Sequence, residues 1–487
     1  MKDGQTSLPD GDIVVKNVHL AYLDKDRAAK IWSVQCHGGR VLKISPSGED
    51  ARSTEVSESV SLEDPTTSSV LDAQGGLMLP SLCHSHIHLD KCFILDRCGE
   101  LVKGDFAEAM EVTKAAKSEF SKRSDDLYNR GARIIRESIE NGVTAMRAHI
   151  EVDTSVGFAC LDAAVKLQDD YHGHCEVQIA IFAQEPLFDS LDHQEPGQNF
   201  ILLKEAAQRL DVDVVGSAPY VEPSIEQAKK NIGLIFDVAD AQRINHVDFH
   251  LDYNLDPNSE PLVYEVIAQA TTRYRGISAT EPHSKRSTTD DVVSMRDFKS
   301  ACPRITIGHA TRLQLFSAEQ WRELAAAISD LPITFVGLPQ SDMYMQGRGS
   351  KDEPLGAPRG TLRVPYIAQH YGIEVAMSVN NVENAFTPQG SLDPLSLCAF
   401  GVGLFQAATP EDIRTLARSV SLTSKRAIGQ TQIPLDLAPN TDDPADFVVL
   451  HGSQSLQSAV LNPCFDRTTI KSGKVVASRR SVKWFSS

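Results

Sequence analysis

Strand-like and helix-like segments alternate along the middle of the chain, and this alternation limits the fold more than any other feature of the sequence. Short apolar segments typical of strands span residues 143–150, 176–183, 212–216, 247–250, 304–309, 333–336 and 373–378. Segments with apolar residues at helical spacing span residues 124–141, 157–167, 199–209, 225–242, 260–272, 318–329 and 362–371. With a first strand at the histidines near residue 86, the pattern has eight strand–helix units and predicts a (β/α)8 TIM barrel.

Both ends of the chain have the character of short strands instead. Strand-like segments span residues 12–19, 31–36 and 40–44 near the N-terminus, and 446–450 with a hairpin at 469–477 near the C-terminus. The simplest arrangement is a small β-sandwich of residues 1–78 and 432–487, with a barrel of residues 79–431 inserted between them. Residues 47–69 are rich in Ser, Glu, Asp and Thr without periodicity, and we expect an exposed, mobile insertion there.

Composition excludes several classes of partner. The net charge is −17 over 487 residues, whereas nucleic acids and anionic membranes attract basic surfaces. The polar, acidic start of the chain predicts no secretory signal, and apolar runs such as 398–405 are too short to span a bilayer. Nine cysteines without a framework spacing favour free thiols in a reducing compartment. We expect a cytoplasmic homo-oligomer that binds a small-molecule substrate, without nucleic-acid or membrane partners.

Two histidines one residue apart begin the functional analysis. An apolar run at 76–79, read as a short buried strand closed by Pro80, leads into His86 and His88. Residues i and i+2 of a strand point the same way, so both imidazoles would share one face and form half of a zinc or iron site. Cys83 and Cys92 flank the pair and could be read as thiolate ligands, but small buried cysteines are the favoured interpretation.

The other predicted strands also end in polar residues. In a TIM barrel the chemistry lies at the carboxyl ends of the strands, so these residues would gather at one mouth. Strand ends two to eight carry His149, Glu151 and Asp153; Gln184 and Glu185; Tyr220 and Glu222; His250 and Asp252; His309; Gln346; and Asn380 with Asn381. Histidines at the ends of strands one, five and six together indicate a metal centre more strongly than any single one.

The run from His86 to Lys91, His-Ile-His-Leu-Asp-Lys, resembles the amidohydrolase superfamily, in the branch of cytosine deaminase and N-isopropylammelide isopropylamidohydrolase. Residues 177–185, 213–216, 345–348 and 444–450 resemble further stretches of these enzymes, with residues 47–69 and 272–300 as apparent insertions. The resemblance implies one divalent metal, zinc or iron, held by His86, His88 and His250.

The same resemblance assigns roles around the substrate. His309 matches a strand-six histidine that holds the attacking water or the leaving group. Gln184 matches a glutamine that reads the substrate amide edge, since an amide offers a donor and an acceptor together. Asn381 and Gln346 are expected to contact substrate as well.

Two positions depart from the family pattern. Asn380 stands where the family has an aspartate that binds the metal and takes the proton from water, and an amide is no base near neutral pH. Tyr253 stands where cytosine deaminase has a proton-shuttling glutamate. Asp252 is the favoured substitute base, with His309 as another candidate. For Glu383 and Asp393, loop solvation and helix capping are the favoured interpretations.

The leading hypothesis is therefore a metal-dependent hydrolase that acts on a C–N bond of a small nitrogen heterocycle or cyclic amide. Cytosine deamination itself is in doubt, because both family carboxylates are missing. One alternative is a non-hydrolytic enzyme on the same scaffold, such as a lyase, decarboxylase or cyclase. Another is a catalytically silent protein that binds a metal or ligand.

Overall fold

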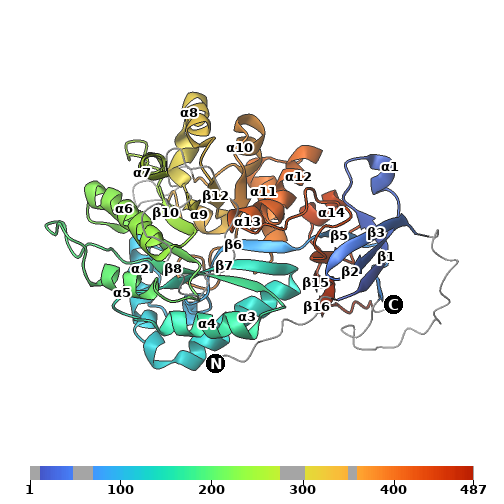
Figure 1. Ribbon diagram of the computed structural model, residues 1–487, viewed down its shortest axis with the longest axis horizontal. Helices are drawn as coiled ribbons and strands as arrows, with labels where there is room; N and C mark the ends of the chain where they lie inside the picture. Colours follow the sequence, from blue (N-terminus) through green and yellow to red (C-terminus); the bar gives the residue numbers. More distant parts are fainter. Residues whose placement is uncertain (1–10, 48–69, 275–301, 349–358, 486–487) are drawn as a thin grey trace, which may run out of the picture.

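A computed structural model describes residues 11–47, 70–274, 302–348 and 359–485. Eight parallel strands with surrounding helices form a barrel, and strands from both chain ends form a second sheet at one end of the molecule (Figure 1). The predicted TIM barrel with a small terminal β domain is confirmed. The insertion predicted at 47–69 lies, apart from Ser47, outside the described residues, and so do residues 275–300 of the second apparent insertion.

The barrel strands follow one another in sequence order around the barrel. They are β6 (Leu82–His88), β7 (Val143–Glu151), β8 (Glu176–Ala183), β9 (Val214–Ser217), β10 (His246–Leu251), β11 (Arg304–His309), β12 (Ile333–Gly337) and β13 (Val375–Met377). The barrel closes where the chain after β13 meets β6: His88 N–H donates to Asn380 O at 3.0 Å, and Asn380 N–H donates to His86 O at 3.1 Å. This closure places Asn380 directly beside the histidine strand.

Helices cover the outside of the barrel. They are α2 (Phe106–Lys117), α3 (Ser124–Glu140), α4 (Ala159–Asp170), α5 (Gln198–Ala206), α6 (Ile225–Gln242), α7 (Val263–Tyr274), α8 (Ala318–Ile328), α9 (Pro339–Met345), α10 (Val364–Tyr371), α11 (Pro394–Phe405), α12 (Pro410–Ser419) and α13 (Leu422–Ala427). Their apolar faces are buried against the strands, and caps such as Ser224 before α6 begin them. The seven helices predicted from periodicity are present, whereas no range was predicted for α2, α9, α11, α12 and α13.

The terminal sheet contains β1 (Ile13–Leu20), β2 (Trp32–His37), β3 (Arg40–Pro46), β4 (Val70–Asp72), β5 (Leu77–Pro80), β14 (Phe447–Leu450), β15 (Arg467–Lys471) and β16 (Lys474–Arg479). Short helices α1 (Lys25–Ala28) and α14 (Leu456–Leu461) lie in its connections. β1 joins two halves of the sheet, since it pairs with β2 and β4 along its first part and with β5 at its end. The halves share one apolar core that includes Val34, Met78, Phe447 and Ile470.

The predicted strand at residues 76–79 belongs to this terminal sheet. It is β5, which pairs with β1 and β14, and the histidines have a separate strand, β6, after Ser81. The boundary between residues 78 and 79 that the sequence suggested thus falls within β5. The ranges 1–78 with 432–487 and 79–431 stay a prediction.

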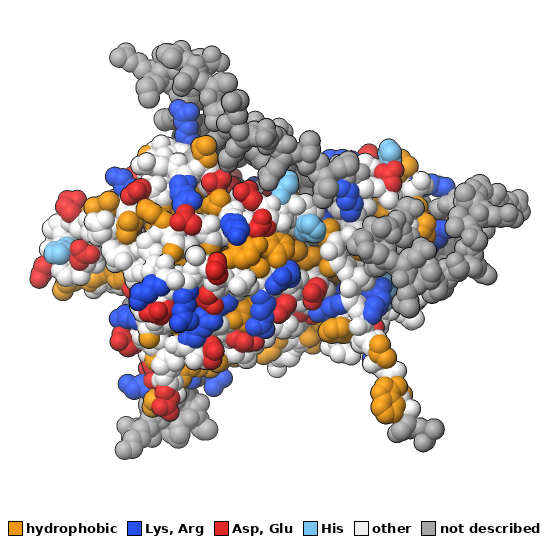
Figure 2. All heavy atoms as spheres, turned by 90° about the horizontal axis from the view of Figure 1, so that it is seen from below, with side chains coloured by type: hydrophobic (Ala, Val, Ile, Leu, Met, Phe, Trp, Pro, Cys, Tyr) orange, Lys and Arg blue, Asp and Glu red, His pale blue; other side chains and the backbone are white. Residues whose placement is uncertain are grey.

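The described surface is mixed in charge. On the face shown in Figure 2, Lys and Arg side chains lie among Asp and Glu side chains rather than on a separate patch. None of the described helices combines the length and the hydropathy that a bilayer-spanning helix needs.

A buried ion pair fastens the terminal sheet to the barrel. The Arg467 guanidinium in β15 donates to both carboxylate oxygens of Asp393 at 2.7 and 2.6 Å, and to Asn141 O at 2.9 Å. Asp393 also accepts from Leu395 N–H at 3.0 Å and so caps α11, which confirms the capping role predicted for it.

We expect Arg467→Met to lower the free energy of unfolding by ~3–5 kcal/mol, because Asp393 would remain as a buried charge without its partner. Urea unfolding followed by circular dichroism measures this loss. Arg133→Met is the control, since Arg133 and Glu137 form an exposed pair that is worth under ~1 kcal/mol. Equal effects of the two substitutions would contradict the prediction.

Candidate active site

Five histidines meet at the carboxyl ends of the barrel strands. His86 and His88 come from β6, His149 from β7, His250 from β10 and His309 from β11. All are buried, and the centroids of the neighbouring rings lie 4.1–5.9 Å apart. The structure therefore brings together the four histidines predicted for the site and adds His149.

The nitrogens of this cluster fit a metal ion. Both ring nitrogens of His86, Nδ1 of His88 and Nε2 of His250 are buried and have no hydrogen-bond partner in the described part of the chain. Burial lowers the pKa of all three imidazoles well below its usual range, so they stay neutral and keep a lone pair for a metal. Buried polar atoms without partners are costly, and a divalent cation would satisfy them.

A different combination of ligands lies closer together, since the donor atoms of His86, His88 and His250 do not all lie within 4.8 Å of one another. Donor atoms of His86, His149, Asp248 and His250 lie within 4.8 Å of one another. In this combination Asp248 Oδ2 contacts Arg147 Nη1 at 3.1 Å. Asp248 Oδ1 lies 3.1 Å from His149 Nε2, but neither Oδ1 nor the two His149 nitrogens form a hydrogen bond in the described part of the chain. Because His88 and His250 also face the pocket at the barrel mouth, the combination of His86, His88 and His250 fits a metal that reaches a ligand.

The pocket beside the cluster has aromatic walls. Its lining consists of His88, Lys91, Phe106, Gln184, Tyr220, His250, Tyr253, His309, Asn380, Asn381 and Phe386. Phe106, at the start of α2, contacts Tyr220, Tyr253 and Phe386 at centroid distances of 5.6, 5.9 and 5.7 Å. The free space is about 20 Å³, so a ring can enter only when these side chains move apart. Once open, the aromatic faces suit a flat heterocycle.

Gln184 lines the pocket and shares its amide oxygen with a lysine. Lys91 Nζ donates to Gln184 Oε1 at 2.8 Å and uses one of the two lone pairs of this oxygen. The amide nitrogen remains, next to the phenol of Tyr220. Gln184 can therefore donate to a ligand, and the ligand must supply the acceptor.

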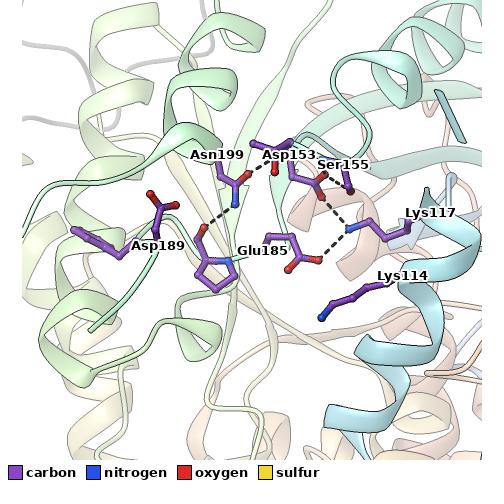
Figure 3. A pocket seen from close by; sticks show the side chains of 10 residues that line it. Lys114, Lys117, Asp153, Ser155, Glu185, Asp189 and Asn199 are labelled. Carbon is purple, nitrogen blue, oxygen red and sulfur yellow. Dashed lines mark hydrogen bonds and ion pairs between the residues drawn. The ribbon is translucent and has the colours of Figure 1, made fainter. Parts of the chain in front are cut away.

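A chain of ion pairs holds Lys91 in place. Lys91 Nζ contacts Glu151 at 2.9 Å, and Lys117 of α2 contacts the other Glu151 oxygen at 2.7 Å. Lys117 also contacts Asp153 at 2.8 Å and Glu185 at 3.1 Å (Figure 3). Burial opposes the charge of Lys117, but these carboxylates raise its pKa well above the usual value. Lys117, Asp153 and Glu185 line a separate outer cavity of about 340 Å³ (Figure 3). The chain of ion pairs leads from this cavity through Glu151 to Lys91 in the inner pocket.

His309 has a carboxylate behind it. Its Nδ1 lies 2.8 Å from Oδ1 of Asp342, a fully buried residue of α9. The Tyr253 ring packs on the imidazole at a centroid distance of 3.8 Å. Burial raises the pKa of Tyr253 well above its usual value, so this phenol keeps its proton and cannot shuttle it as a glutamate would.

Asn380 faces the same pocket with its amide oxygen free. Its Nδ2 donates to Ser341 Oγ at 2.8 Å, and Ser341 Oγ lies 2.6 Å from Thr387 Oγ1. The Asn380 Oδ1 atom is buried and has no partner in the described residues. Asn381 also lines the pocket, and its oxygen accepts from Asn384 Nδ2 at 2.9 Å.

Two predicted site residues do not reach the pocket. Both carboxylate oxygens of Asp252 accept backbone N–H groups at the start of α7, from Leu262 at 2.7 Å and Val263 at 3.1 Å. Gln346 donates to the backbone oxygen of Tyr253 at 3.2 Å instead of pointing at a ligand. Neither residue is part of the pocket lining. The structure therefore does not place Asp252 where a substitute base must stand.

Sequence reasoning missed several residues of the site. His149 was recognised at a strand end but not as a neighbour of the ligands, although its place in the strand order was a usable signal. Asp248 lies two residues before His250 and could have been found by the same two-residue spacing. Asp342 and Phe106 lie on helices that carried no motif, so no sequence signal indicated them.

No protein-family model matches the chain. It is 23% identical over 411 residues to a pterin deaminase of Rhizobium rhizogenes, and the match covers 83% of this chain and 82% of the relative.

Two solved structures resemble the whole chain. A 5-methylcytosine deaminase from Klebsiella pneumoniae has a TM-score of 0.75 at 19% identity, over 97% of this chain and 100% of its own. An N-isopropylammelide isopropylaminohydrolase from Burkholderia multivorans has a TM-score of 0.70 at 19% identity, over 96% of this chain and 98% of its own. The chain thus has the fold of the cytosine deaminase and isopropylammelide hydrolase enzymes, the branch that its histidine run resembles.

Proposed function

We propose that this chain is a metal-dependent hydrolase that removes an amino group from a planar nitrogen heterocycle, with pterin-like rings as the first candidates. The observation that carries the proposal is the group of buried, neutral imidazoles with unpartnered nitrogens beside an aromatic-walled pocket. The names of the relatives support it, since they include a pterin deaminase and a 5-methylcytosine deaminase.

His86, His88 and His250 would hold one divalent metal ion. Zinc and iron both suit imidazole ligands, so the donor atoms fit either. A metal bound there would supply Lewis-acid activation of water. Asn380 Oδ1 lies at the end of the neighbouring strand and offers a neutral oxygen rather than a carboxylate.

The protein side chains divide the remaining tasks. In hydrolytic deamination a C–O bond forms at the ring carbon, the C–N bond breaks and ammonia leaves, so one proton of the water moves to the leaving amino group and the other stays with the product. His309 faces the pocket and would carry this proton. Lys91 and the Gln184 amide would donate to an oxygen or ring nitrogen of the substrate. The aromatic walls would hold the ring flat.

The proposal predicts ammonia release from an amino-substituted heterocycle. Zinc-loaded or iron-loaded protein would be assayed with pterin, 5-methylcytosine and guanine, and we expect one equivalent of ammonia per molecule of product for at least one of them. In ¹⁸O-labelled water the product should gain one labelled oxygen. Chelation should abolish turnover, and the metal should restore it. Ammonia without label, or no ammonia from any of the rings, would contradict hydrolysis.

The proposed set of metal ligands predicts that substitutions of two neighbouring histidines have different effects on metal content. His88→Ala should lose most of the bound metal, because it removes one of three ligands. His149→Ala should keep close to one equivalent, because His149 pairs with Asp248 instead. Elemental analysis of protein purified without chelators measures both variants. Metal loss in His149→Ala with metal retention in His88→Ala would favour the combination of His86, His149, Asp248 and His250 as the ligands.

The substitution Asn380→Asp tests whether the site has no general base or whether another residue serves as the base. The side chains are nearly isosteric, and Ser341 can donate to a carboxylate by turning its hydroxyl. We expect tighter metal binding from the added charge but a kcat within about tenfold of wild type, since His309 would already carry the proton. Restoring a base that was absent would give ~10²–10⁴-fold. Asn381→Asp is the matched control, with a carboxylate at the next residue of the same pocket. A hundredfold gain in Asn380→Asp alone would contradict the role of His309.

A further inference from the structure

The pairing of His309 with Asp342 determines which nitrogen of the ring faces the pocket. Nδ1 points at Asp342 Oδ1, 2.8 Å away, so Nε2 is the nitrogen left on the pocket side. A carboxylate only accepts hydrogen bonds when it is ionised. Nδ1 must therefore carry the hydrogen in this contact, and a neutral ring then keeps its lone pair on Nε2.

The surroundings of Asp342 keep its carboxylate in this acceptor role. Its second oxygen accepts from the hydroxyl of Thr361 at 2.6 Å and from Leu338 N–H at 3.3 Å. Burial raises the pKa of Asp342, and its hydrogen bonds with His309 and Thr361 oppose this rise. Two donors, Thr361 and Leu338, thus converge on one oxygen and leave the other oxygen to face His309 Nδ1, which is an arrangement expected for an anion.

The imidazole itself has little freedom to turn. The Tyr253 ring lies against one side at a centroid distance of 3.8 Å, and the backbone of His309 is in the left-handed region with φ of 66°. Such a conformation in a residue other than glycine persists only where the surroundings enforce it. The chain thus fixes the ring position through the backbone and its tautomer through Asp342.

We propose that Asp342 is a positioning residue that holds His309 in the Nδ1–H tautomer and presents Nε2 to the pocket as a hydrogen-bond acceptor. The catalytic meaning of this arrangement rests on the proposed function, because an acceptor at Nε2 is what a proton-carrying His309 requires. The tautomer itself can be measured without any turnover.

The first measurement uses unsubstituted protein. Zinc-loaded protein with ¹⁵N-labelled histidine would be studied by NMR, with His309→Gln to assign the His309 signals. We expect the hydrogen on Nδ1 and an unprotonated Nε2 in the neutral ring. A hydrogen on Nε2 in the wild-type protein would overturn the proposal, whatever the substrate and the reaction are.

The second measurement uses Asp342→Asn. The amide oxygen can still accept from Thr361 and Leu338, which turns the amide N–H group toward His309 and inverts its tautomer. We expect the hydrogen to move to Nε2 and kcat for ammonia release to fall ~10²–10⁴-fold, with KM within about threefold. Asp252→Asn is the matched control, a buried carboxylate that binds only backbone N–H groups in the described chain. It should keep the Nδ1–H tautomer.

The outcomes separate this proposal from the proposed function. If wild-type protein has the hydrogen on Nδ1 of His309 and Asp342→Asn moves it to Nε2, the positioning role is supported even if no ring releases ammonia. Inversion with an unchanged kcat would overturn the catalytic consequence, and a preserved tautomer in Asp342→Asn would overturn the positioning role. Zinc content and thermal unfolding of each variant show whether it is folded, and the wild-type measurement decides the tautomer if Asp342→Asn does not fold.

Discussion

Imidazole nitrogens buried without partners in the described part of the chain are the constraint on which the rest of this structure depends. Each unpartnered buried polar atom costs ~1–3 kcal/mol, and His86, His88 and His250 together carry several. Parallel strands bring them together because every strand ends at the same face of the barrel. In a barrel whose sequence was selected for stability alone, apolar side chains would fill this space. The cost is offset when a cation or ligand supplies the missing interactions.

Charged and aromatic residues of α2 cover the same face of the barrel, and they hold the two ends of this helix with different strength. Lys117 at the end of α2 is held by three carboxylates of the barrel, so this end of the helix is anchored. Phe106 at the other end contacts the rings of Tyr220, Tyr253 and Phe386 and packs against a small apolar cluster that includes Met345 and Ala385. With about 20 Å³ of free space, entry of a ring requires local displacement. Ring contacts are lost at smaller cost than buried ion pairs, so we expect the Phe106 end to move more readily than the Lys117 end.

Residues at strand ends could be predicted because strand order and period determine where they lie. His86, His250 and His309 were found from hydrophobic periodicity and the two-residue spacing within strands. The role of Asp252 could not be found in this way. Its backbone has φ of 52°, which turns the side chain away from the strand direction and onto the N–H groups before α7. Sequence periodicity contains no information about such a local reversal.

Interactions between the side chains of residues remote in sequence could not be predicted from the sequence either. Gln184 was placed correctly at the end of β8, but its hydrogen-bonding character depends on Lys91, which lies on a different strand end. Asp342 is a further example, since it follows β12 on a short helix and meets His309 only in the folded barrel. Pairs of this kind depend on distances of about 3 Å between remote residues, and a residue pattern does not fix such distances.

The position of negative charge around the site constrains the ligand. An asparagine at 380 makes the site more positive by one unit than an aspartate there would. The nearby carboxylates of Asp342 and Asp248 are each directed at a histidine or an arginine rather than at the pocket. Lys91 Nζ and the Gln184 amide supply N–H donors beside each other, and no carboxylate is among the described residues that line the pocket. The edge formed by Lys91 and Gln184 therefore favours rings with oxygen or unprotonated nitrogen acceptors there. The departures from the family pattern thus alter the electrostatics of the site, while the imidazoles proposed as metal ligands are retained.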